Sequence, residues 1–268
     1  MLNTNTIPYL LRNSLKYMLK PILYSLLLLL GSITCLAEQS TSQAKISIII
    51  DDLGNHPNLD SAIANLPGPI VCSVLPYRPF TKAVIEQAKQ QQKPIILHIP
   101  MQAQAEIALG AGGLTSQFNK EHFTRVLQRQ LAAHPDVQGV SNHMGSKLTQ
   151  NQEHMAWFME ELSKHDLFFV DSRTACNSVA EKTAKQYNIP TLHRDVFLDN
   201  IRNYQAIDKQ FQELLTIAKK YGHAVAIGHP YPVTIKYLQQ AIPKLAEQGI
   251  ELVPINELLN LTHKTDLN

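Results

Sequence analysis

The stretch KISIIIDDLGNH, residues 45–56, bears most directly on the fold class. Its isoleucines at positions 46, 48, 49 and 50 predict a buried strand, of the kind found in parallel sheets. Two adjacent carboxylates, Asp51 and Asp52, follow this strand directly. Because an unpaired buried carboxylate is costly, the pair is expected to hold a cation, share a proton or face a polar cleft.

Short β-branched runs alternate with helix-like segments along the rest of the chain, which predicts βαβ units and a parallel sheet. Seven or eight such units in a chain of 268 residues favour a closed or nearly closed barrel in one domain over an open, doubly wound sheet. No Gly-x-Gly-x-x-Gly motif follows the first strand, which weakens a dinucleotide-binding interpretation. The strand-like runs are 46–50, 69–75, 94–99, 137–142, 167–171, 190–196, 224–229 and 250–255. The helix-like segments are 78–92, 119–134, 152–165, 179–187, 208–222 and 234–249, and a longer loop spans 101–117.

The N-terminal segment has the pattern of a secretory signal peptide over residues 1–37. Basic residues precede a short apolar core, and the segment ends in the small-residue exit TCLA. A polar tether at 38–44 and a barrel domain at 45–262 complete the predicted organisation. An uncleaved membrane anchor and a lipoprotein cysteine at Cys35 are the alternatives, so contact with a membrane is expected only if this segment is retained. We therefore expect an exported, periplasmic protein.

Charge and cysteine content narrow the function classes further. The formal charge of +2 gives no electrostatic case for binding nucleic acid or an anionic membrane surface. After cleavage only Cys72 and Cys176 would remain, and they could pair in an oxidising compartment. Two buried, unpaired cysteines are the simpler interpretation.

Nearly every predicted strand ends in a carboxylate or an imidazole. In a parallel α/β barrel these ends meet at one rim, where active sites lie. Each residue alone could be a capping aspartate or a core histidine, but a joint convergence on one rim favours a site. Aspartates and histidines together are the ligand set of zinc or a similar divalent ion. In chain order these residues are Asp51, Asp52, His98, Asn142, His143, Asp171, His193, Asp195 and His229.

Around these residues the sequence resembles the divergent polysaccharide deacetylase family, an outlying branch of the NodB-homology polysaccharide deacetylases. The similarity runs from about Lys45 to Pro254. It implies a distorted parallel (β/α) barrel, a bound divalent metal and hydrolysis of an N- or O-acetyl group on a glycan. The motifs that carry it, in order, are IIIDDLGN, LPGPIVCSVLPY, ILHIPMQ, NHMGSKLT, FFVDSRT, LHRDVFLDN and AIGHPYP.

Matched residue by residue, this resemblance implies the role of general base for Asp51 and of general acid for His229. It implies that Asp52 and His98 are metal ligands. The wider superfamily has a second ligand histidine four residues after the first, where this sequence has Gln102. That departure leaves the metal one ligand short unless His143 of the NHMG motif supplies it.

The expected metal site therefore consists of Asp52, His98 and His143, with zinc as the expected ion. Four further residues are candidates for binding substrate or supporting the site: Asp171, Arg173, Gln102 and Asn142.

Three functions follow from this set of residues. The first is a metal-dependent hydrolase that removes acetyl groups from an envelope polysaccharide, and the intact Asp51, Asp52 and His229 favour it. The second is a barrel without catalysis that binds a glycan or maintains the envelope, which Gln102 favours. The third and weakest is a glycoside hydrolase, whose two carboxylates could be Asp51 and Asp171. Neither the sugar nor the oligomeric state follows from the sequence.

Overall fold

The computed structural model of the protein describes residues 43–265. The predicted signal peptide at 1–37 and most of the predicted tether lie outside the described residues. Within residues 43–265, no helix has both the length and the apolar character that a membrane crossing requires.

Strands and helices alternate through the described chain. The strands are β1 (Ala44–Leu53), β2 (Val71–Val74), β3 (Ile95–Met101), β4 (Gly139–Met144), β5 (Phe168–Asp171), β6 (Thr191–His193), β7 (Val196–Phe197), β8 (His223–Gly228) and β9 (Ile250–Leu252). The helices are α2 (Pro57–Ala64), α3 (Thr81–Gln90), α4 (Lys120–Ala133), α5 (Gln152–Leu162), α6 (Ala180–Gln186), α7 (Tyr204–Tyr221), α8 (Pro232–Ala241) and α9 (Ile255–Thr265). Short 3₁₀ turns lie at Leu148–Gln150, Ile242–Lys244 and Ala246–Gln248.

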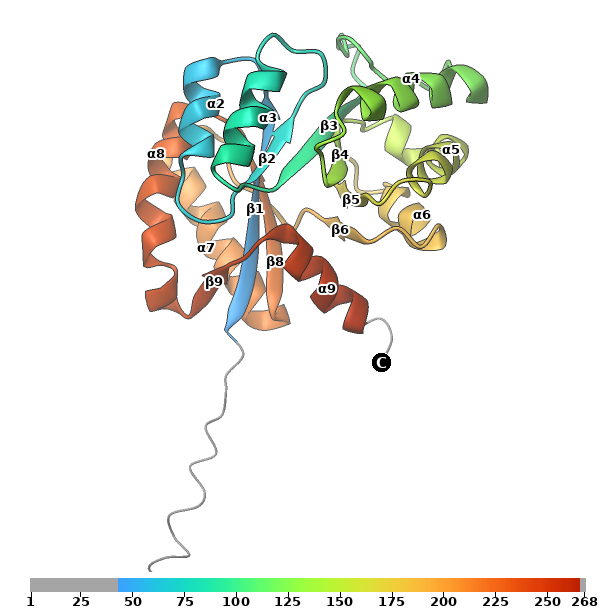
Figure 1. Cartoon of the computed structure of the whole chain (residues 1–268). Coiled ribbons are helices and arrows are strands. Elements are labelled where there is room, and N and C mark those ends of the chain that lie inside the picture. The colour runs from blue at the N-terminus through green and yellow to red at the C-terminus, as the bar shows by residue number, and fades with distance from the viewer. Residues whose placement is uncertain (1–42, 266–268) are drawn as a thin grey trace, which may run out of the picture. The chain divides into compact units, whose positions relative to one another are not determined.

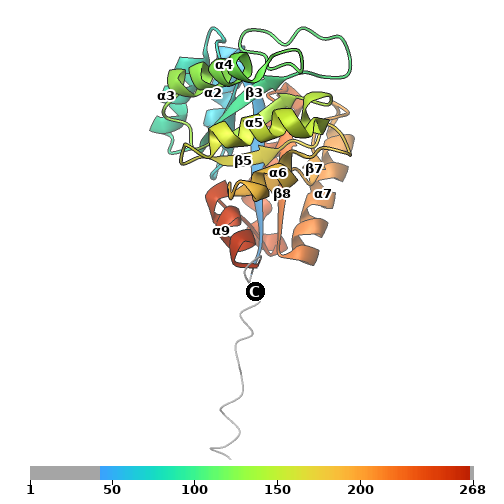
Figure 2. The same ribbon diagram turned by 90° about the vertical axis from the view of Figure 1, so that its right-hand side faces the viewer.

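The described strands form one curled parallel sheet with helices around its outside (Figures 1 and 2). Its order is β6-β5-β4-β3-β2-β1-β8-β7, and β9 pairs with the start of β1. In Figure 1, α4, α5 and α6 lie to one side of the strands, and α2, α3, α7 and α8 lie to the other. The predicted distorted (β/α) barrel is therefore confirmed.

The curled sheet does not close, because β6 and β7 stand at its two ends without pairing. The prediction of one strand at 190–196 is wrong at this point. The amide of Arg194 donates to the carbonyl of Asp171 on β5 (3.0 Å), whereas the amide of Asp195 donates to the carbonyl of Val225 on β8 (2.9 Å). The chain thus crosses from one end of the sheet to the other within two residues. We call this crossing, with the two strands beside it, the seam.

Other elements also differ from the sequence prediction. The helix expected over 234–249 ends at Ala241, because Pro243 has no amide hydrogen to continue it. The strand expected over 250–255 ends at Leu252, and α9 then begins at Ile255. Helix α2 was not predicted; it is short and starts with Pro57, a residue favoured in a first helical turn.

Two apolar clusters divide the core. The outer cluster lies between the sheet and the helices and includes Ile46, Ile48 and Ile50 of β1. The inner cluster lies inside the curl and includes Ile49, with strand residues from β2, β3, β5, β6 and β8. Helix α9 contributes three apolar residues to it, Ile255, Leu258 and Leu259. Since full burial of one such side chain contributes about 1.5–3 kcal/mol, α9 is a substantial part of the interior.

The two cysteines of the described chain remain unpaired. Cys72 is buried in β2, and Cys176 is exposed in the loop after β5. The predicted burial is confirmed for Cys72 and wrong for Cys176, and the alternative of a disulfide between them is wrong.

Candidate active site

Alternation along the strands decides which polar residues enter the curl. Successive side chains of a strand point to opposite faces, so a residue two positions after an inner apolar residue shares its face. Three candidate residues are related in this way to an isoleucine of the inner cluster. The pairs, isoleucine first, are Ile49 and Asp51, Ile96 and His98, and Ile227 and His229.

Asp52 reaches the same place by a different route. By alternation it would share the outward face of Ile50, but the pairing of β1 with β2 shifts register between Ile50 and Leu53. Asp52 has a φ of 63°, a left-handed conformation that aspartate tolerates better than most residues. The irregularity turns its carboxylate toward the histidines, with Oδ1 2.8 Å from Nδ1 of His143 and 3.5 Å from Nε2 of His98.

Asp52, His98 and His143 fit a divalent metal ion. One ligand atom from each lies within 4.8 Å of the others. Oδ1 of Asp52 is buried and makes no hydrogen bond within the described residues, although Nδ1 of His143 is nearby. One carboxylate oxygen with two imidazole nitrogens is a ligand set that zinc and similar ions accept, with coordination positions left over for water or substrate.

The protonation of two of these side chains suits this role. Burial and the charge of His143 hold the pKa of His98 well below its usual range, despite the nearby carboxylate of Asp52. Burial alone would raise the pKa of Asp52, but its contact with His143 and the charges of the surrounding imidazoles hold it below its usual range. Neutral imidazole and ionised carboxylate are the forms that bind metal.

Two serines orient the His98 ring. Oγ of Ser141 on β4 lies 2.7 Å from Nδ1 of His98, and Oγ of Ser73 on β2 lies 3.3 Å from Oγ of Ser141. Oδ1 of Asp51 is 3.4 Å from the same Nδ1 atom. Because these contacts engage Nδ1, Nε2 is the nitrogen left to face Asp52, as is usual for a histidine with a partner behind it.

Asp51 has the properties of a general base. It is 2% exposed, and burial raises its pKa to about 7, reinforced by the negative charge of Asp52. The charge of His229 and a hydrogen bond from Ser73 act in the opposite direction. Oδ1 of Asp51 is buried without a hydrogen bond within the described residues. A carboxylate with a pKa near 7 is well matched to proton transfer at neutral pH.

His229 is oriented by Asp199, a residue that the sequence interpretation did not single out. Nδ1 of His229 lies 2.9 Å from Oδ1 of Asp199, while the amide of His229 and the hydroxyl of Thr234 donate to Oδ2 at 2.6 and 2.8 Å. Burial would lower the pKa of His229, but Asp199 and the charges of Asp51 and Asp52 raise it. Nε2 is 3.9 Å from Oδ2 of Asp52, so the imidazole ring borders the metal-binding set.

Two aromatic rings pack against His229. Its centroid lies 5.2 Å from that of Phe197 and 5.6 Å from that of Tyr231, which is stacked on it. Arg194 lies over Phe197 and Arg202 over Tyr231, at 5.2 and 3.8 Å from the ring centroids. These contacts restrict rotation of the imidazole and fix where its Nε2 atom faces.

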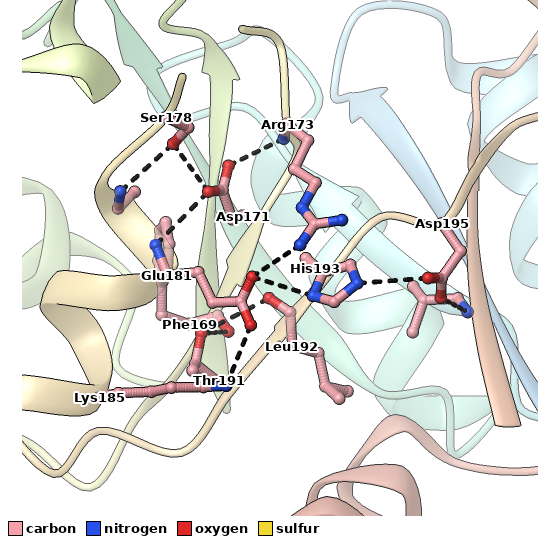
Figure 3. Close-up of polar contacts among 12 residues, drawn as sticks. Phe169, Asp171, Arg173, Ser178, Glu181, Lys185, Thr191, Leu192, His193 and Asp195 are labelled. Carbon is pink, nitrogen blue, oxygen red and sulfur yellow. Dashed lines mark hydrogen bonds and ion pairs between the residues drawn. The ribbon is translucent and has the colours of Figure 1, made fainter. Parts of the chain in front are cut away.

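Asp171 and Asn142 lie at the predicted strand ends but on the other face of the sheet. Asp171 shares its face with Phe169 of the outer cluster. Its oxygens accept from the amide of Arg173 (2.8 Å), the hydroxyl of Ser178 (2.7 Å) and the amide of Glu181 (3.4 Å), as Figure 3 shows. Asn142 is fully buried; its amide group donates to the carbonyl of Met144, and its Oδ1 accepts from the amide of Ser172. In this arrangement both side chains brace the backbone after β4 and β5.

Gln102 and Arg173 also lie apart from the carboxylate–imidazole set. Oε1 of Gln102 accepts from the amide and the hydroxyl of Ser116, at 2.9 and 2.8 Å, so this side chain ties down the long loop after β3. Arg173 donates to Glu181 (3.0 Å) and lines a cavity beside α6.

The site includes three residues that were not predicted from the sequence, Ser73, Ser141 and Asp199, although the sequence holds a signal for each. Ser73 is a single hydroxyl within the apolar strand VCSV, and Ser141 comes two residues before His143 and so shares its face of β4. Asp199 is a carboxylate directly after the run VFL, but the strand predicted over 190–196 merged β6 with the start of β7 and stopped short of this strand end.

The family model described as "Divergent polysaccharide deacetylase" matches residues 48–259. An uncharacterised protein of Haemophilus influenzae is 36% identical over 219 residues, which cover 82% of this chain and 78% of that protein. The uncharacterised protein YibQ of Escherichia coli is 32% identical over 216 residues, covering 81% of this chain and 67% of that one.

A similar solved structure is that of the uncharacterised protein ATU2773 from Agrobacterium tumefaciens. The two superimpose with a TM-score of 0.78 at 21% identity, over 81% of this chain and 89% of the other. That likeness concerns the fold.

Proposed function

Because the chain belongs to the divergent polysaccharide deacetylase family, we propose that it hydrolyses acetyl groups on a polysaccharide with the help of a divalent metal, zinc being the expected ion. One observation carries the proposal. Asp51 and His229, which have the properties of a base and an acid, both lie within 4 Å of the set Asp52, His98 and His143. Hydrolysis of an amide or ester needs a base, an acid and a centre that stabilises negative charge.

Each of these residues has a part in the proposed reaction. A divalent ion held by Asp52, His98 and His143 would supply Lewis acidity, polarising a carbonyl and making water easier to deprotonate. Asp51 accepts the proton of the attacking water. His229, its ring held by Asp199, gives a proton to the leaving amine or alkoxide of the sugar.

Release of acetate tests the proposal. Purified protein loaded with zinc is incubated with acetylated chitin oligosaccharides and with peptidoglycan, and acetate is measured by NMR. The Asp51→Asn variant should release none while keeping its zinc, because Asp51 is not among the expected ligands. Asp166→Asn, a change at an exposed carboxylate, is the matched control and should behave as wild type. Full activity in Asp51→Asn would refute the assignment of the base.

A second candidate function is glycan binding without hydrolysis. The observation that favours it is the engagement of Gln102 by Ser116, since Gln102 stands where the wider superfamily has a ligand histidine. This candidate predicts binding of an acetylated glycan with no acetate release from any substrate, so the same assay with a binding measurement separates the two.

An exported protein acting on an envelope glycan is the setting we propose. The support is the signal-peptide pattern of residues 1–37 and the carbohydrate chemistry of the family. N-terminal sequencing of protein from the envelope fraction tests this: export predicts a start after Ala37. A protein that starts at Met1 and fractionates with the cytosol would contradict it.

A further inference from the structure

A long polar groove lies along the seam. Two cavities, of about 1070 and 490 Å³, meet at Arg194 and Asp195, the two residues that cross between the ends of the sheet. The larger lies against α6 and the loop after β5, and the smaller against the start of α7. We call these two cavities together the seam groove. Its cationic side chains are Arg173, Lys182, Lys185, Arg194 and Lys209.

Each carboxylate of the seam groove forms ion pairs or hydrogen bonds with other residues of the protein. Glu181 contacts Arg173 (3.0 Å), Lys185 (3.2 Å) and His193 (3.0 Å), as seen in Figure 3. Asp195 contacts the other nitrogen of His193 (3.2 Å) and accepts from the amide of Val225 (2.8 Å). The third carboxylate, Asp171, accepts hydrogen bonds from two backbone amides and a hydroxyl, as described above. The three carboxylates are thus engaged within the protein, and the five cationic side chains of the groove outnumber them.

Three cations of the seam groove are not paired in this way. Lys182 and Lys209, one in each cavity, are exposed and form no ion pair within the described residues. The guanidinium of Arg194 donates to the carbonyls of Ser172 and Arg173, both at 2.8 Å, and within the same residues it likewise lacks a carboxylate partner at ion-pair distance. The groove thus presents an excess of positive charge along its length.

Arg194 also connects the groove with the candidate active site. Its guanidinium lies over Phe197, 5.2 Å from the ring centroid, and the Phe197 ring flanks His229 with a centroid separation of 5.2 Å. A polymer with one unit at Asp51 and its neighbours along Arg194 would therefore bring its next units into the seam groove.

We propose that the seam groove binds acidic groups, carboxylate or phosphate, on the glycan chain whose acetylated unit occupies the candidate active site. The ligand is then an anionic polysaccharide rather than a neutral one. This proposal rests on the proposed function only in taking a glycan as the ligand. It holds equally if that glycan is bound without being hydrolysed.

Binding of matched oligosaccharides tests the proposal. The zinc-loaded full chain is titrated by calorimetry with chitohexaose, with the same hexamer carrying 6-O-carboxymethyl groups, and with the hexamer carrying 6-phosphates. Wild type should bind both acidic hexamers about tenfold more tightly than the neutral one, and the preference should shrink with added salt. The tighter of the two acidic hexamers identifies the anion.

Variants at the unpaired lysines supply the second arm. Since an exposed ion pair contributes about 0.5 kcal/mol, the double variant Lys182→Gln with Lys209→Gln should lose about fivefold in affinity for the acidic hexamers. Its affinity for chitohexaose should stay the same. Lys219→Gln, also exposed on α7 but outside both cavities, is the matched control and should change neither.

The outcomes separate this inference from the proposed function. If wild type binds neutral and acidic hexamers equally, or if the double variant keeps its full preference, the seam groove is not an anion site, even where acetate is released. If the acidic preference and its loss in the double variant are seen without acetate release from any hexamer, the groove assignment stands and the hydrolase assignment fails.

Discussion

Replacing His193 with glutamine should destabilise the protein at pH 6 and have almost no effect above pH 9. His193 ends β6 and stands at the seam, with Nδ1 3.0 Å from Glu181 of α6 and Nε2 3.2 Å from Asp195 (Figure 3). Its two ring nitrogens therefore join two carboxylates across a point where the sheet has no strand pairing. Glutamine keeps polar atoms at this position but removes the charge.

The pKa shifts set the size of the effect. Burial would lower the pKa of His193, but its hydrogen bonds to Asp195 and Glu181 raise it from 6.5 to about 9. The hydrogen bond from His193 is also the main cause that lowers the pKa of Glu181 to about 2 against its burial. At 1.36 kcal/mol for each pKa unit, the change in either pKa corresponds to a stabilising free energy of about 3 kcal/mol. Both values describe one contact, so they are not added. The His193 side chain is 31% exposed, and solvent screening reduces the expected contribution to about 1–2 kcal/mol.

The pH dependence has a definite sign. Below about pH 6.5 the histidine is protonated in both the folded and the unfolded chain, so its stabilisation is complete. Between 6.5 and about 9 the unfolded chain loses the proton while the folded chain keeps it, and the stabilisation falls away. At the acid end, the contribution of Glu181 is complete above 4.5 and is lost as the pH falls through about 2. The largest effect is therefore expected between pH 4.5 and 6.5.

Urea unfolding at pH 6.0 and 9.5 measures this directly. His193→Gln should lower the free energy of unfolding by about 1–2 kcal/mol at the first pH and by less than about 0.5 kcal/mol at the second. His165→Gln is the matched control, because His165 is 40% exposed and lies 3.6 Å from Glu161 one turn away on α5. It should stay within about 0.5 kcal/mol of wild type at both pH values. An equal loss for His193→Gln at pH 6.0 and 9.5 would refute the electrostatic explanation and leave only packing.

Three further predictions concern the site and the sheet. Asp199→Asn should lower acetate release about 100-fold or more while leaving bound zinc unchanged, because it weakens the protonated form of His229; equal rates would show that His229 is not the acid. A chelator should abolish acetate release and added zinc should restore it, whereas an active metal-free protein would exclude the proposed role of the ion. Gly139→Ala should lower the free energy of unfolding by about 1–3 kcal/mol in a denaturant titration, since the new Cβ would lie 2.5–2.7 Å from ring atoms of Phe168; an unchanged midpoint would show that this ring moves aside at no cost.

The strands that bury apolar residues on both faces were predicted from the sequence, because a short continuous β-branched run is typical of a buried strand in a parallel sheet. Residues 46–50 were expected as a strand and lie within β1, and of the strand expected over 94–99 all but the first residue lie within β3. Once the sheet is parallel, the two-residue repeat places Asp51 and His98 on the inner face, which is why these candidates came together. His143 followed from the same order of strands, together with the family resemblance.

The sequence did not predict those features of the site that depend on local irregularities of the backbone. The register shift at Asp52 and its positive φ are not periodic features, yet they turn its carboxylate toward the histidines. Asp171 illustrates the converse, since it ends a strand but shares the outer face with Phe169. The break between β6 and β7 depends on which strands accept the amides of Arg194 and Asp195, a long-range choice that no local run of residues encodes.

That break has a consequence for the kind of ligand the protein can accept. Here the two-residue crossing satisfies its amides on β5 and β8, so the sheet stays open along the seam without leaving these two amides unpaired. The seam groove extends along this opening, next to the ring that flanks His229. For the proposed glycan ligand, this opening gives the chain a path from the acetylated unit past Arg194 into the seam groove.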